Sequence, residues 1–121
     1  MADQVIEYPN GDRYVGESFD GKENGFGITI YSCGDRYEGD WQNSLFHGKG
    51  VYSYHDGRKY EGEFMNGKRH GHGTYFYSDG RYYEGEFRNS KRHGNGTYWN
   101  ADGSIMHSGL WEDGRPIITG A

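Results

Sequence analysis

The sequence predicts an all-β fold, an elongated single-layer antiparallel meander of tandem 23-residue β-hairpin repeats. Three observations predict it. The same glycines and aromatic residues recur every 23 residues, side-chain character alternates with period two inside each repeat, and the composition combines 12 Tyr and 22 Gly with 2 Pro. A fixed period of this length is typical of repeat architectures, and tyrosine-rich alternation is typical of strands.

Five columns of residues define the repeat. One tyrosine column and four glycine columns keep the same interval through four units. The columns are Tyr14, Tyr37, Tyr60 and Tyr83; Gly16, Gly39, Gly62 and Gly85; Gly25, Gly48, Gly71 and Gly94; Gly27, Gly50, Gly73 and Gly96; and Gly34, Gly57, Gly80 and Gly103. Units that recur in this way stack on their neighbours and form one continuous array.

Each unit is expected to contain two short strands. In 60–64 the two rings and the glycine fall on one face and the two glutamates on the other, and 71–77 alternates in the same way. The links 66–70 and 78–81 are short and rich in turn residues. Neighbouring strands are therefore expected to be antiparallel, in a meander of about nine strands.

The whole chain, 1–121, is expected to form one repeat domain. A half unit at 5–13 precedes full units at 14–36, 37–59, 60–82 and 83–105, and a half unit at 107–114 follows them. The last half unit begins one residue later than the period predicts. We therefore expect a one-residue insertion, such as a β-bulge, within Ser104–Met106. Ser18 also departs from the pattern, because later units carry an aromatic residue there.

The repeat resembles the MORN repeat (membrane occupation and recognition nexus). Residues 68–75, Lys-Arg-His-Gly-His-Gly-Thr-Tyr, and 83–87, Tyr-Glu-Gly-Glu-Phe, carry the resemblance most closely, and it extends over almost all of the chain. It implies a single-layer sheet whose aromatic-lined concave face holds extended or helical segments of partner proteins. The later repeats look most like those of ciliary radial-spoke head proteins, which implies a cytoskeletal or ciliary assembly.

Aromatic side chains are expected to line one face of the sheet. A single-layer sheet has no second layer to cover them, so these rings pack over neighbouring glycines, remain available to a partner, or do both. Tyrosine and tryptophan are favoured interface anchors. The expected function is a non-catalytic protein-binding scaffold. The expected partner-binding groove consists of Tyr37, Trp41, Tyr52, Tyr60, Phe64, Tyr75, Tyr83, Phe87 and Tyr98.

The sequence predicts no catalytic residue, no metal site and no cofactor. Carboxylate pairs recur in identical surroundings on the opposite face, so nothing separates their pKa values as acid catalysis requires, and we expect them to be solvated. The pairs are Glu38/Asp40, Glu61/Glu63 and Glu84/Glu86. His47, His70 and His93 share one column, where a spacing of about 10 Å is too long for one zinc ion. Cys33, the single cysteine, has no evident activating partner.

Two basic clusters raise an alternative function, a membrane adaptor that binds phosphoinositides or other acidic lipids. Lys68, Arg69, Lys91 and Arg92 are expected in turns along one edge of the sheet, where they could meet lipid phosphates. The clusters are short, and the net charge of -5 opposes long-range attraction to anionic membranes and to nucleic acid. A protein is therefore the expected partner, and no nucleic-acid binding is expected.

The ends of the sheet are expected to expose strand edges. Val5–Tyr8 and Leu110–Trp111 would offer unpaired backbone groups there, which predicts a homodimer through the terminal strands. The N-terminus has no signal-peptide pattern, and no segment approaches about 18 consecutive apolar residues. We expect a cytoplasmic location, and the resemblance adds an association with the cytoskeleton or axoneme.

Overall fold

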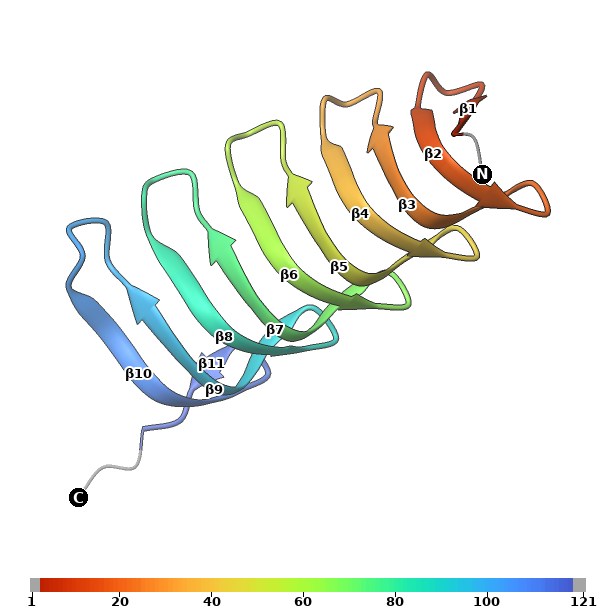
Figure 1. Cartoon of the computed structure of the whole chain (residues 1–121). Coiled ribbons are helices and arrows are strands. Elements are labelled where there is room, and N and C mark those ends of the chain that lie inside the picture. The colour runs from red at the N-terminus through yellow and green to blue at the C-terminus, as the bar shows by residue number, and fades with distance from the viewer. Residues whose placement is uncertain (1–2, 119–121) are drawn as a thin grey trace.

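The computed structural model describes residues 3–118, which form one open antiparallel sheet of eleven strands (Figure 1). The strands lie in the sheet in their chain order, so every connection is a hairpin. They are β1 (Gln4–Glu7), β2 (Arg13–Phe19), β3 (Lys22–Ile30), β4 (Arg36–Gln42), β5 (Leu45–Ser53), β6 (Lys59–Met65), β7 (Lys68–Phe76), β8 (Tyr82–Arg88), β9 (Lys91–Trp99), β10 (Ile105–Glu112) and β11 (Arg115–Pro116). The predicted meander is confirmed, with more strands than the nine or so expected, and β11 lies beyond the last predicted half unit.

Glycine faces glycine across the middle of neighbouring strands. Gly39 of β4 pairs with Gly50 of β5, and Gly50 pairs with Gly62 of β6. A Cβ atom added to Gly39 would lie 2.4 Å from the Cα of Gly50, so the strands can approach this closely only without side chains there. We call this row the glycine line. It consists of Gly16, Gly27, Gly39, Gly50, Gly62, Gly73, Gly85, Gly96 and Gly109.

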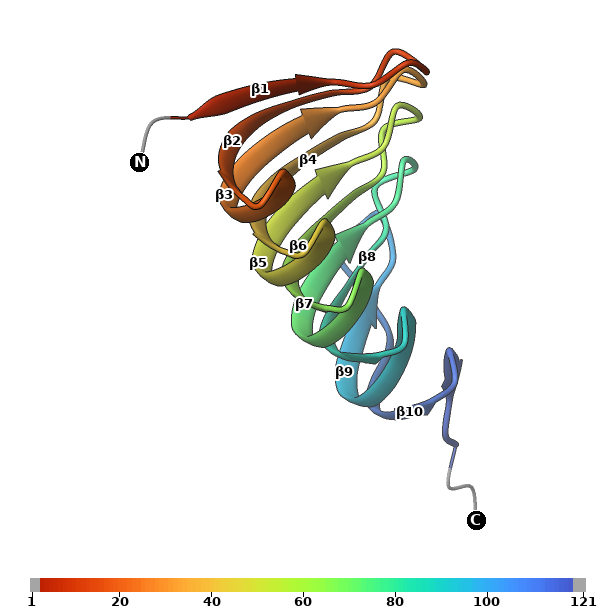
Figure 2. The same ribbon diagram turned by 90° about the vertical axis from the view of Figure 1, so that its right-hand side faces the viewer.

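The long strands β2–β10 bend near the glycine line, which gives the sheet a gutter-like cross-section (Figure 2). The Tyr37 hydroxyl donates a 2.7 Å hydrogen bond to the carbonyl oxygen of Asp40, three residues along the same strand. Tyr60 and Tyr83 make the equivalent bond in later repeats. Because each of these hydroxyls bonds a carbonyl oxygen of its own strand, the strand must curve toward the tyrosine side chain. We call the face that carries Tyr37 the inner face and the face that carries Glu38 the outer face.

A bulge accompanies each bend. In β5, residues 47–49 lie opposite the single residue Asp40, and the glycine at their centre has a φ of 74°. The Asp40 carboxylate accepts a 3.2 Å hydrogen bond from the Lys49 backbone N–H, and Glu63 accepts one from His72 at 2.7 Å in the next repeat. Carboxylates that we expected only to be solvated therefore also bind N–H groups that the bulges remove from the ladder.

The last hairpin contains the insertion that the repeat period predicts. The register between β9 and β10 shifts between Ile105 and His107, which leaves Met106 without an opposite residue. The predicted one-residue bulge is therefore confirmed. Its effect is to return Trp111 to the inner face, in line with the aromatic column of the earlier units.

The two ends of the sheet differ. The N-terminal end is the edge strand β1, which contains most of the predicted Val5–Tyr8 edge. The edge predicted at Leu110–Trp111 is wrong, because β11 pairs outside β10 and the Ile117 N–H donates to the Leu110 carbonyl oxygen at 2.8 Å. The last strand ends in Pro116, which has no backbone N–H to offer a further strand.

Candidate functional site

The inner face holds a continuous ladder of aromatic rings. Tyr37 meets Trp41 of its own strand and Phe64 of the next repeat edge to face, with ring centroids 5.0 Å and 5.4 Å apart. Tyr60 repeats this pattern with Phe64 and Phe87. The ladder runs through Tyr14, Trp41, Tyr37, Phe64, Tyr60, Phe87, Tyr83 and Trp111. Each such pair contributes about 0.5–1.5 kcal/mol beyond burial, so the ladder ties every repeat to its neighbour.

The ladder is buried within the chain itself. Tyr37 and Tyr83 are 0 % exposed and Trp41 is 6 % exposed. Burial raises the pKa of Tyr83 to about 12, so its hydroxyl remains a hydrogen-bond donor at neutral pH. The rings do not line an open groove in this chain, because the bent strands wrap them and the rings of adjacent repeats cover one another. Partner binding by these residues stays a prediction. Of Tyr37, Trp41, Tyr52, Tyr60, Phe64, Tyr75, Tyr83, Phe87 and Tyr98, all but the half-buried Tyr52 are buried.

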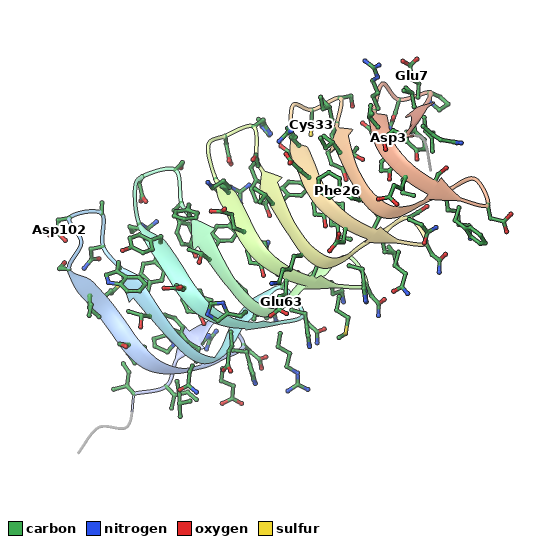
Figure 3. All side chains as sticks on the ribbon, in the orientation of Figure 1. Asp3, Glu7, Phe26, Cys33, Glu63 and Asp102 are labelled. Atoms are coloured by element: carbon green, nitrogen blue, oxygen red, sulfur yellow. The ribbon has the colours of Figure 1, made fainter. Side chains whose placement is uncertain are left out.

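A groove instead follows the outer face, along the glycine line. The strands curve away from this face, so the side chains on the two sides of the glycine line diverge and leave a trough between them. Over β3–β7 the trough has a volume of about 790 Å³, and over β7–β10 a further stretch of about 510 Å³ continues it, with His72 lining both. We call it the outer groove. Figure 3 labels Phe26 and Glu63, two residues of its walls.

Carboxylates dominate the walls of the outer groove. One wall carries Glu38, Glu61 and Glu84, and the other carries Asp40, Glu63 and Glu86. Among the described residues, Lys49 is the one lysine that lines the groove, and no arginine lines it. The walls therefore present a run of negative charge along the ribbon, which is complementary to a cationic chain.

Exposed ion pairs neutralise only part of this charge. Arg36 pairs with Glu38 at 2.8 Å and Lys59 pairs with Glu61 at 3.4 Å, in both cases with side chains about half exposed. Glu84 has no ion-pair partner among residues 3–118. Exposed pairs of this kind contribute only about 0–1 kcal/mol, so a bound cation can replace them at little cost.

A second aromatic row lies on the outer face, and the sequence interpretation missed it. Phe76, Tyr82 and Trp99 stack across β7, β8 and β9, with centroids 6.0 Å and 4.6 Å apart, and the Lys59 ammonium lies 5.0 Å from the Phe76 ring centroid. All three rings are partly exposed, and Trp99 also lines the outer groove. The period-two alternation of the sequence could have predicted this row, because Phe76 lies between two inward-facing tyrosines and must face outward.

The basic clusters lie in strands, and their arginines point inward. The Arg69 guanidinium donates to the Tyr54 hydroxyl at 3.0 Å and to the Ser90 carbonyl oxygen at 2.7 Å, and it lies 5.0 Å from the Tyr75 ring centroid. Arg92 makes the equivalent contacts one repeat later, with its guanidinium 5.3 Å from the Tyr98 ring centroid. The expectation that both arginines project from turns is therefore wrong, because neighbouring tyrosines bind them. Lys68 and Lys91 are exposed, and no helix within residues 3–118 is long and apolar enough to cross a membrane.

Asp35 organises the hairpin turns at the other side of the sheet. It accepts hydrogen bonds from the backbone N–H and the Nδ1 of His55, both at 2.8 Å, and from the Tyr52 hydroxyl at 2.7 Å. Burial raises the pKa of the Asp35 carboxyl, but these hydrogen bonds outweigh burial and lower the pKa to about 2. Cys33, which is exposed, has its sulfur within 4.8 Å of ligand atoms of Asp35 and His55.

This Cys33–Asp35–His55 group is the one cluster of three metal-ligand types that converges within the described residues. The carboxylate of Asp35 already accepts hydrogen bonds from His55 and Tyr52 of the next repeat. One repeat earlier Asp12 accepts a 2.8 Å hydrogen bond from the Ser32 backbone N–H in the same way, without a cysteine or histidine partner. The recurring role of this position is therefore to join successive turns, and the histidine column His47, His70 and His93 is not part of the cluster.

Comparison with known families agrees with the repeat geometry. The family model described as MORN repeat matches four segments, residues 14–36, 37–57, 60–80 and 83–105. These segments comprise most of the chain. No curated protein sequence matches the chain significantly.

Proposed function

Because the chain belongs to the MORN repeat family, we propose that it is a non-catalytic protein-binding module that holds an extended, basic segment of a partner in the outer groove. The single observation that carries this proposal is the outer groove itself, a trough along the ribbon whose two walls repeat carboxylates in every full unit after the first. Along the ring ladder the inner face is filled by the chain's own side chains, so a segment that lies along the ribbon has more room on the outer face.

The dimensions suit a peptide. The groove crosses β3 to β10, and seven steps of about 4.8 Å give roughly 34 Å, the length of about ten extended residues. The floor is glycine backbone, so a peptide can approach closely. Lysine or arginine side chains of the segment would meet Glu61 and Glu84, while Tyr82 and Trp99 at one end supply rigid apolar anchors.

A defined peptide tests the proposal. A ten-residue peptide that alternates lysine and valine is expected to bind the chain, and binding should weaken as salt is raised. The variant Glu38→Gln/Glu61→Gln/Glu84→Gln should weaken binding about tenfold or more, because three charge pairs are lost. The matched control Asp3→Asn/Glu7→Gln/Glu112→Gln removes the same charge outside the groove and should bind normally.

The opposite outcome is equally clear. Equal affinity for a peptide that alternates glutamate and valine, or equal weakening by the control variant, would refute the groove as a site for basic segments. Cross-linking of natural partners from cell extract then asks whether their contact peptides are basic and extended.

The remaining expectations on partners and location stay predictions. The cytoskeletal or ciliary setting is checked by localising a tagged chain relative to the axoneme, and the homodimer by sedimentation equilibrium. The acidic-lipid alternative is not favoured, because Arg69 and Arg92 already bind tyrosines and backbone carbonyls. The test is sedimentation of the chain with phosphoinositide vesicles. If the chain binds the vesicles and a Lys68→Gln/Lys91→Gln variant does not, the ligand would be a membrane and not a protein.

A further inference from the structure

The inner face contains a cavity at the N-terminal end of the sheet, beside β1–β3 (red to orange in Figure 1). It has a volume of about 320 Å³. Its walls combine two carboxylates, Asp12 and Glu23, with the rings of Tyr31 and Trp41 and the hydroxyl of Thr29. It is separate from the outer groove, which lies on the opposite face.

The repeat itself explains why the cavity exists. Two repeat lengths later, 46 residues along the chain (58 − 12), the positions of Asp12 and Glu23 are occupied by Arg58 and Arg69. In that unit the ring that corresponds to Thr29 is Tyr75. The first unit thus has short or acidic side chains where the third unit has two guanidinium groups and a ring.

The third unit also shows what fits in this space. Arg58 donates a 3.0 Å hydrogen bond to the Tyr75 hydroxyl, and its guanidinium lies 4.2 Å from the Tyr54 ring centroid. Arg69 lies over Tyr75 and binds the Tyr54 hydroxyl. Guanidinium groups are therefore the natural filling of this site, held by tyrosine rings and hydroxyls.

The first unit carries the opposite charge and no cation of its own. Glu23 is 7 % exposed, and within residues 3–118 its carboxylate accepts hydrogen bonds only from the neutral hydroxyls of Tyr8 and Ser44. Neither Asp12 nor Glu23 forms an ion pair with a described residue. A buried carboxylate without a cation is costly, so this site gains more than a solvated one from binding a cation.

A second observation points the same way. Thr29 is 3 % exposed and lines the cavity, and its Oγ1 has no hydrogen-bond partner. Buried hydroxyls are almost always paired, so an unpaired one in a cavity wall marks a place for a donor from outside. A guanidinium carries five N–H donors, more than the Glu23 carboxylate alone can accept, so one remains for the Thr29 hydroxyl once that side chain turns toward the cavity.

We infer that this cavity binds a guanidinium cation, presented on an arginine side chain of a partner protein. The planar guanidinium pairs with carboxylate oxygens through parallel hydrogen bonds. Its faces pack against the Tyr31 and Trp41 rings. The first unit thereby takes from a partner the group that the third unit supplies for itself.

The test uses the full chain, labelled with ¹⁵N, and a capped arginine, N-acetyl-arginine methylamide. Saturable shifts of the Thr29, Tyr31 and Ser44 amides are expected. The citrulline analogue, which has the same shape without the charge, should bind at least about tenfold more weakly. An arginine-containing peptide should shift the same amides. Comparison with free arginine distinguishes the two sources, because equal binding of the free amino acid would indicate a metabolite and not a protein ligand.

Three variants complete the design. Glu23→Gln keeps an acceptor for Tyr8 and Ser44 but removes the charge, and should weaken arginine binding about tenfold or more. Thr29→Tyr introduces the residue of the third unit, fills the cavity and should abolish the shifts. The matched control Glu112→Gln lies at the opposite end of the sheet, outside both the cavity and the outer groove, and should bind normally. Circular dichroism confirms that each variant is folded.

Several results would overturn the inference. They are the absence of saturable shifts at Thr29 and Ser44, equal binding of citrulline, equal binding of the capped lysine analogue, or normal arginine binding by folded Glu23→Gln. None of these touches the outer groove. Its basic-peptide test therefore stands or fails independently.

Discussion

The hydroxyl of Tyr60 lies where a Cβ atom of Gly73 would be, since an added Cβ at Gly73 would come within 2.3 Å of it. Gly73 of β7 lies opposite Gly62 of β6, two residues after Tyr60, and the Tyr60 hydroxyl also donates a 2.7 Å hydrogen bond to the Glu63 carbonyl oxygen. One missing side chain thus allows a buried ring, a strand bend and a hydrogen bond at the same place.

The substitution Gly73→Ala is expected to destabilise the chain by about 3 kcal/mol, because either the Tyr60 ring or the strand must move. Urea unfolding followed by circular dichroism measures the loss. The matched control is Gly103→Ala, where an added Cβ meets nothing within 4 Å and the cost is the strain of a φ of 88°, about 1 kcal/mol. Equal losses in both variants would mean that close approach is not the reason for glycine at position 73.

Trp41→Ala should reduce stability by about 3–5 kcal/mol, because it removes a buried ring from the middle of the ladder. Phe26→Ala, on the outer face with Phe26 47 % exposed, should change stability by no more than about 0.5 kcal/mol and weaken binding of the basic peptide instead. Thermal unfolding and peptide titration of both variants separate the two roles. A stable Trp41→Ala chain that loses only peptide binding would restore the inner face as the binding surface.

The lowered pKa of Asp35 predicts that the folded chain loses stability in acid. Its pKa falls from 3.8 unfolded to about 2 folded, so its contribution is present above pH 4 and is lost as the pH falls from about 4 to 2. The shift corresponds to about 2 kcal/mol. The free energy of unfolding of Asp35→Asn should therefore fall less over this range than that of the natural chain. The matched control Glu61→Gln removes an exposed carboxylate, and its free energy of unfolding should fall over this pH range as much as that of the natural chain.

The sequence predicted the architecture well because the signals are local. The 23-residue interval of the tyrosine column and the alternation within each unit are both set by neighbours in the chain, and they led to a single-layer meander. Even the bulge at Met106 followed from a one-residue change of interval. The curvature did not follow, because it depends on contacts between Tyr37 and glycines of two strands.

The candidate site was predicted less well for the same reason. Trp41 and Phe64 were assigned correctly to one face, but whether that face is open depends on how far the strands bend. The bend buried these rings and opened the outer face, where Phe76 and Trp99 lie. Arg69 was placed in a turn, because its partners Tyr54 and Ser90 come from neighbouring units and no local pattern reveals them.

Pro116 makes the two ends of the sheet different, because the last strand ends in a residue without a backbone N–H. If two copies join through β1, as the predicted homodimer requires, each copy uses its free edge and leaves the proline-ended strand β11 on the outside. Because Pro116 offers no N–H to a further strand, the expected assembly is a dimer and not a fibre.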